Sequence, residues 1–123
     1  MEKKIVKLAV TSQGTDLDSR VDPSFGRAKY FVLVDAETGE FSAHDNQQNI
    51  NAAQGAGIQA AGNVAELRAE AVITGSVGPN AFATLHAAGI ETYIGAAGSV
   101  REAIGQFKDG KLERAGKEGV EGY

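Results

Sequence analysis

The sequence predicts a single α/β domain in which a mixed five-stranded sheet carries helices on both faces. The chain has 123 residues, 42% of them hydrophobic, and a domain of this size buries roughly two-thirds of its unfolded surface. Short apolar runs alternate with segments of helical periodicity, which is the pattern of α/β proteins. The 16 glycines lie mostly between these segments, where tight turns require them.

The first half of the chain predicts three strands with no helix between them. Residues 5–10 are apolar and rich in β-branched side chains, which is typical of a central strand. Residues 30–34 form the second predicted strand, and residues 40–44 return antiparallel to it through a turn in which Gly39 takes a positive φ. The polar segment 11–24 is a loop, and loops of this length in compact domains are often functional.

The second half of the chain predicts helices and strands in alternation. Buried strands are expected at residues 71–74 and 91–94. The helix expected between them, residues 79–88, begins at Pro79 and is capped by Gly89. The helix before them spans residues 55–68, and its apolar stripe comprises Ile58, Ala61, Val64 and Ala65.

The third helix has the clearest start signal in the chain. Ser99 and Glu102 have the spacing of a capping box, in which each side chain satisfies a backbone amide of the first turn. The apolar stripe that follows comprises Val100, Ala103, Ile104 and Phe107. We therefore expect an ordered domain over residues 1–110 and a flexible tail over residues 111–123, which hold few apolar side chains.

The connections between these elements predict the order of the strands. The right-handed crossover rule places the fourth strand parallel to the first, and the fifth parallel to the fourth. The expected order is 3-2-1-4-5, and only the third strand, at the edge, is expected to run antiparallel to its neighbour.

Composition excludes several classes of function. The chain has no cysteine, so it forms no disulfide and offers no thiolate to zinc or to an iron–sulfur cluster. Its net charge of −4 argues against a general nucleic-acid binder. The first apolar run is too short for a signal peptide or a membrane span. We therefore expect a cytoplasmic protein without nucleic-acid or membrane partners.

Two glycine-containing turns are candidates for an anion site. Gly75, Ser76 and Gly78 lie between a predicted strand and the helix that follows it, and Gly55 and Gly57 open the first helix. Free amides and the helix dipole attract anions at such positions, and ligands bind at the carboxyl edge of open α/β sheets. Neither turn is a P-loop or a dinucleotide fingerprint, so tight turning alone is the alternative explanation for these glycines.

A third candidate segment precedes the second strand. Arg27 offers a planar fork to an anion and Lys29 a point charge. Gly26 is expected to take an unusual φ or to permit a close backbone approach, and Phe25 is expected to anchor the segment in the core. The alternative is that both cations are solvated, or that they pair with Asp16, Asp18 or Asp22.

No set of residues in the sequence has the pattern of a catalytic site. His44 and His86 are far apart in the chain, whereas a metal site needs converging ligands. Two-metal nucleases carry carboxylates on their central strands, and the strand at residues 5–10 has none. No nucleophile elbow is present. We therefore expect a protein that is not an enzyme.

The run Phe-Gly-Arg-Ala-Lys-Tyr-Phe at residues 25–31, followed by the two glycine turns, resembles the dinitrogenase iron-molybdenum cofactor biosynthesis family. The resemblance covers roughly residues 6–107. It implies a ribonuclease H-like fold. It also implies a non-catalytic protein that binds or carries an anionic metal–sulfur or molybdenum cofactor precursor and works beside cofactor-assembly proteins.

The resemblance also implies a set of site residues. This chain departs from the family pattern at Ser24, where the family usually has an arginine, and at Gln54, where it often has a histidine. An iron–sulfur or molybdenum-containing cluster would therefore be held by charge and hydrogen bonds and not by cysteine. The alternative function is a regulatory or scaffolding domain that binds a phosphate-bearing small molecule or a protein partner at the same crevice. The expected binding residues are Gly26, Arg27, Asn49, Gly55, Gly57, Gly75, Ser76 and Gly78.

Overall fold

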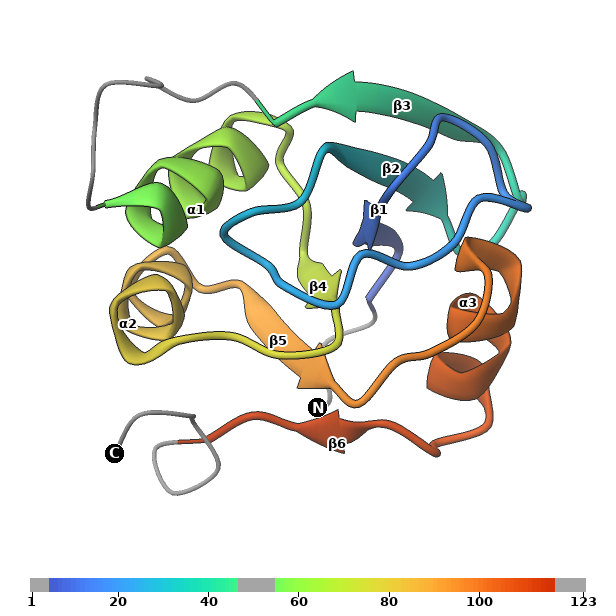
Figure 1. Ribbon diagram of the computed structural model, residues 1–123. Coiled ribbons are helices and arrows are strands. Elements are labelled where there is room, and N and C mark those ends of the chain that lie inside the picture. The colour runs from blue at the N-terminus through green and yellow to red at the C-terminus, as the bar shows by residue number, and fades with distance from the viewer. Residues whose placement is uncertain (1–4, 47–54, 117–123) are drawn as a thin grey trace.

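The computed structural model describes residues 5–46 and 55–116, and these residues form one mixed sheet with helices on both faces (Figure 1). The elements in chain order are β1 (Lys7–Ser12), β2 (Tyr30–Asp35), β3 (Phe41–Asp45), α1 (Ala56–Glu66), β4 (Ala71–Ile73), α2 (Pro79–Ala87), β5 (Glu91–Ile94), α3 (Val100–Lys108) and β6 (Glu113–Arg114).

The sheet has six strands in the order β3-β2-β1-β4-β5-β6. The expected order 3-2-1-4-5 is therefore confirmed, but the expected number of five strands was wrong. The additional strand, β6, pairs antiparallel with β5 and lies in the segment where we expected a tail. Its two residues are both charged and therefore lack the alternation of apolar and polar side chains that predicts a strand.

The direction of β1 relative to β2 also differs from the expectation. The two strands pair antiparallel, as β2 and β3 do, whereas β4 and β5 are parallel to β1 and β4 respectively. Parallel neighbours require a crossover connection, usually a helix. The segment between β1 and β2 is a loop without a helix, and the chain therefore returns antiparallel.

Two apolar layers hold the helices on the sheet. Helices α1 and α2 cover one face through a cluster that includes Phe31, Val64 and Leu85, and α3 covers the other face. The stripe expected on α1 was partly wrong, because Ile58 is 48% exposed and Ala65 is also exposed. The buried residues of α1 are Ala60, Ala61 and Val64, whose small side chains let the helix lie close to the sheet.

The ends of α2 and α3 follow the sequence signals. Gly89 has φ 77 and ends α2 in a Schellman motif, with the Ile90 amide donating to the Leu85 carbonyl at 2.9 Å. The expected capping box at the start of α3 is present. In the described part of the chain, no helix has both the length and the apolar character needed to cross a membrane.

Candidate anion-binding site at the starts of two helices

The loop of residues 22–28, called here the Phe-Gly-Arg loop, lies against the turn that joins β4 to α2. Figure 1 shows it crossing in front of β4 toward α1. The Phe25 amide donates to the Ser76 carbonyl at 3.1 Å, and the Ser76 amide donates to the Pro23 carbonyl at 2.8 Å. The Ser76 hydroxyl donates to the same Pro23 carbonyl at 3.1 Å. Backbone hydrogen bonds therefore join the Phe-Gly-Arg loop to the β4–α2 turn, although the two segments are far apart in the sequence.

Glycines make these contacts close enough for backbones to touch. A Cβ atom on Gly75 would lie 2.7 Å from the Pro23 carbonyl oxygen, and one on Gly26 would lie 3.1 Å from both the Cα and the amide nitrogen of Gly57. A Cβ on Gly57 would in turn lie 2.9 Å from the Cβ of Ala81 on α2. The Phe-Gly-Arg loop, the start of α1 and the start of α2 therefore meet at one place.

Phe25 holds the loop in this position. Its side chain is 1% exposed and belongs to the core cluster beneath α1 and α2. Its ring centroid lies 5.6 Å from that of Phe31 on β2. The expected role of Phe25 as a core anchor is confirmed, and it places Gly26 and Arg27 at the rim of the domain.

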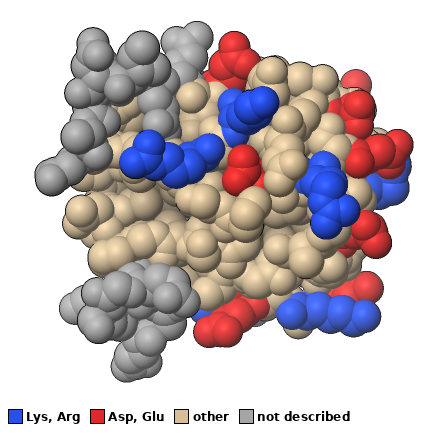
Figure 2. Space-filling view, viewed as in Figure 1, with Lys and Arg blue, Asp and Glu red and all other residues tan. Residues whose placement is uncertain are grey.

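The starts of α1 and α2 carry no side-chain cap. The N-cap residues are Gly55 (φ 89) and Gly78, which have no side chain that could accept a capping hydrogen bond. Neither helix has an acidic residue in its first turn. The positive ends of both helix dipoles therefore lie near the Phe-Gly-Arg loop without a nearby carboxylate from the helices themselves. Figure 2 shows a surface over α2 that is largely free of charged side chains on the face that it shows.

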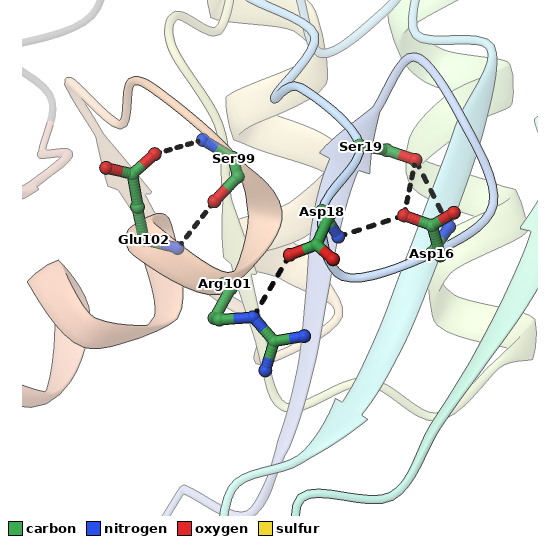
Figure 3. A network of polar contacts seen from close by, with 6 residues as sticks. All are labelled: Asp16, Asp18, Ser19, Ser99, Arg101 and Glu102. Atoms are coloured by element: carbon green, nitrogen blue, oxygen red, sulfur yellow. Dashed lines mark hydrogen bonds and ion pairs between the residues drawn. The ribbon is translucent and has the colours of Figure 1, made fainter.

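The start of α3 differs in that it carries a side-chain cap (Figure 3). The Glu102 amide donates to the Ser99 hydroxyl at 3.0 Å, and the Val100 and Arg101 amides donate to carbonyl groups of Ser19 and Leu17, each at 2.8 Å. This helix start leaves no amides of the first turn for a ligand, so the candidate site involves α1 and α2 only.

The acidic residues of the long loop do not neutralise Arg27. Asp18 pairs with Arg101 on α3 at 3.2 Å, and Asp16 accepts hydrogen bonds from the Asp18 amide and the Ser19 hydroxyl (Figure 3). The Asp22 carboxylate accepts from the Ser24 and Lys29 amides, each at 3.4 Å. Arg27 is exposed, and within residues 5–46 and 55–116 no ion pair involves it.

Two buried threonines lie near this site, and the sequence analysis did not relate either of them to it. Thr11 and Thr74 are both fully buried, and the Thr11 hydroxyl lies 2.9 Å from that of Thr74 and 2.7 Å from the Asp22 carbonyl. A signal was present, because each threonine directly follows an apolar strand run. The parallel register that pairs Val10 with Ile73 makes the two threonines neighbours.

Most of the expected site residues come together in the structure. Gly26, Gly57, Gly75 and Ser76 take part in the contacts above, Gly55 and Gly78 precede the two helices, and Arg27 follows Gly26 directly. Asn49 and Gln54 lie outside the described residues.

The two histidines do not converge. His44 Nε2 lies 2.8 Å from the Ser42 hydroxyl, and His86 stacks on Phe82 with ring centroids 5.8 Å apart. Among the described residues, no group of three or more histidine or acidic side chains could hold a metal ion.

The side chains with shifted pKa values, Asp35 and Tyr93, lie in other parts of the domain. Backbone amides of Thr38 and then Glu37, which donate to the Asp35 carboxylate in the β2–β3 turn, lower its pKa. Burial, followed by a hydrogen bond to Glu91 at 2.8 Å, raises the pKa of the Tyr93 phenol. Tyr93 packs in the cluster under α3, on the sheet face opposite α1 and α2.

Comparison with known proteins agrees with this architecture. An uncharacterised protein of Methanocaldococcus jannaschii is 32% identical over 114 residues, which cover 90% of this chain and 97% of that protein. The apo form of the orange protein from Desulfovibrio gigas has a TM-score of 0.86 and 42% identity, with 93% of this chain and 96% of that chain covered. A NifB-like protein of the DUF35 family from Thermotoga has a TM-score of 0.76 and 37% identity, with 89% and 93% covered.

A family model described as "Dinitrogenase iron-molybdenum cofactor" matches residues 5–110. The match includes the Phe-Gly-Arg loop, both glycine turns and all three helices. The chain therefore belongs to the dinitrogenase iron-molybdenum cofactor family.

Proposed function

We propose that this protein is a non-catalytic carrier that binds an anionic metal–sulfur or molybdenum-containing precursor during metallocofactor assembly. The precursor is the cargo of the protein, received from and passed to other cofactor-assembly proteins. The family match and the similarity to a solved protein described as an apo form support this proposal. The strand order 3-2-1-4-5, antiparallel over its first half and parallel over its second, also supports a ribonuclease H-like fold.

One observation carries the proposal: the Phe-Gly-Arg loop rests on Gly57 and Ser76, at the starts of α1 and α2. This meeting point offers an anion two helix dipoles and the guanidinium of Arg27. Since the whole sequence lacks cysteine, the cargo would be held through hydrogen bonds and charge to its sulfide or oxo periphery. Binding of this kind permits release without the exchange of protein thiolate ligands.

The direct test is titration with tetrathiomolybdate, a sulfide-bearing dianion, followed by visible absorption and calorimetry. We expect Arg27→Ala to weaken binding roughly ten- to a hundred-fold, which is the value of a charge-assisted contact of about 1.5–3 kcal/mol. Affinity should also fall with added salt, because Arg27 is exposed. The matched control is Arg101→Ala, which removes an exposed arginine from α3 and should leave the affinity unchanged.

The proposal would be wrong if the wild-type protein did not bind the thiomolybdate, or if Arg27→Ala and the wild type bound it equally. A thermal shift produced by nucleotides but not by the thiomolybdate would favour the regulatory or scaffolding alternative.

A further inference from the structure

We infer that Thr11 is a positioning residue for this site: its buried hydroxyl fixes the start of the Phe-Gly-Arg loop and thereby holds the loop against the two helix starts. The inference rests on the proposed function, and it adds a residue that lies outside the Phe-Gly-Arg loop and both glycine turns. Thr11 lies in β1, directly after the last residue that pairs with β4.

The hydroxyl groups of Thr11 and Thr74 form a directed chain. A hydroxyl has one proton to donate. The Thr11 hydroxyl donates it to the Asp22 carbonyl at 2.7 Å and therefore accepts a hydrogen bond from the Thr74 hydroxyl, 2.9 Å away. Each bond in such a chain polarises the next one. Both side chains are fully buried, so water does not compete for these bonds.

Asp22 is the residue at which the loop needs an anchor. The next residue is Pro23, which has no backbone N–H, so the chain cannot be fixed there through an amide. Thr11 instead binds Asp22 twice, because its carbonyl accepts the Asp22 amide at 2.9 Å and its hydroxyl donates to the Asp22 carbonyl. The Asp22 carboxylate then accepts from the Ser24 and Lys29 amides, near the two ends of the loop.

The consequence of losing the Thr11 hydroxyl follows from these contacts. Thr11→Val leaves the Asp22 carbonyl and the Thr74 hydroxyl without their partner, and such groups favour a conformation in which they reach water. The loop then spends part of its time away from Ser76. The apparent affinity of a ligand falls in proportion to the fraction of molecules that are competent to bind it.

The experiment combines two measurements on the full chain. The first is hydrogen exchange of the Phe25 and Ser76 amides, which join the loop to the β4–α2 turn. The second is the dissociation constant for tetrathiomolybdate. For Thr11→Val we expect exchange at these two amides to quicken about ten-fold relative to amides of the central strands, and affinity to fall about ten-fold.

Three further variants serve as controls. Thr11→Ser keeps the hydroxyl and should restore both wild-type values. Thr74→Val keeps the bond to Asp22 and should have a smaller effect in the same direction. Thr92→Val makes the same substitution at another buried threonine, on β5, whose hydroxyl has no partner among the described residues, and it should change neither measurement.

The outcomes separate this inference from the function on which it rests. If Thr11→Val leaves exchange at Phe25 and Ser76 unchanged, the inference is overturned even where the thiomolybdate binds. If the wild type does not bind the thiomolybdate, the proposed function fails, and exchange alone decides whether Thr11 positions the loop. Should Thr11→Val not fold, Thr11→Ala, which also lacks the hydroxyl, decides, and a wild-type exchange pattern at Phe25 and Ser76 in that variant overturns the inference.

Discussion

Replacing Gly75 with alanine should separate the Phe-Gly-Arg loop from the β4–α2 turn. The added methyl group would lie 2.7 Å from the Pro23 carbonyl oxygen, 2.9 Å from its Cα and 3.2 Å from its carbonyl carbon. All three are backbone atoms, so no rotamer change relieves the contact. Ordinary contact begins at 3.4 Å, and reaching it requires the loop to move by about 0.7 Å.

A movement of this size lengthens the hydrogen bonds between Ser76 and residues Pro23 and Phe25, now 2.8 and 3.1 Å, beyond their normal range. Two weakened bonds cost about 0.5–1.5 kcal/mol each, and overpacking adds about 1–3 kcal/mol. The reduced freedom of the unfolded chain offsets about 0.4–1 kcal/mol. We therefore expect a net loss of about 2–5 kcal/mol in the free energy of unfolding, measured by urea denaturation.

Gly62→Ala is the matched control for this change. Gly62 lies in α1, and a Cβ there would meet nothing within 4 Å. Alanine is the better helix former, so this variant should gain about 0.5–1 kcal/mol. The two substitutions are chemically identical and should shift the urea midpoint in opposite directions. Equal shifts in one direction would refute the argument that Gly75 is required by its contact with Pro23.

Three further predictions concern residues away from the site. Ser99→Ala should lower stability by about 0.5–2 kcal/mol through loss of the bond to the Glu102 amide, and an unchanged denaturation midpoint would show that Ser99 does not stabilise α3. Thr92→Val should raise stability by about 1 kcal/mol, because it removes a buried hydroxyl that has no partner among the described residues; a loss in thermal denaturation would contradict this. The lowered pKa of Asp35 means that its contribution to stability is present above its unfolded value and is lost as pH falls through the lower folded value. The stability difference between the wild type and Asp35→Asn should therefore be constant near neutral pH and shrink as the pH falls below about 4, and a difference that stays constant in acid would argue against a role for the Asp35 charge.

The sequence predicted the elements with strong local signals. The capping box of Ser99, the cap at Gly89 and the β2–β3 turn, where Gly39 has φ 82, depend on neighbouring residues only, and all three are confirmed. The expected first strand was shifted by two residues, because β1 spans Lys7–Ser12. Thr11 and Ser12 are polar, so periodicity excluded them, yet both are fully buried and paired with β2.

The long-range features could be predicted only in part. The positions of Gly26, Gly57 and Gly75 in the sequence indicated that the backbone there turns tightly or is closely approached. Which part of the chain each glycine touches depends on the fold and could not be read from the sequence. The antiparallel direction of β1 and β2, the pairing of β6 and the pairing of Asp18 with Arg101 join residues that no local pattern relates. The exposure of Ile58 was missed for the same reason, since its position on α1 fits the apolar stripe in sequence but lies outside the contact with the sheet.

The contact of Gly57 with both Gly26 and Ala81 has a consequence for when the proposed site is first complete during synthesis. The three parts of the proposed site come from the beginning, middle and later half of the chain, so a nascent chain that ends before α2 would lack one of these parts. Only chains that have folded completely should then bind the ligand. A ligand that binds only the native state stabilises it by about 2.7 kcal/mol at a hundred times its dissociation constant. Loaded molecules should therefore resist proteolysis and unfolding longer than empty ones, and the supply of cargo would set how much of this protein a cell retains.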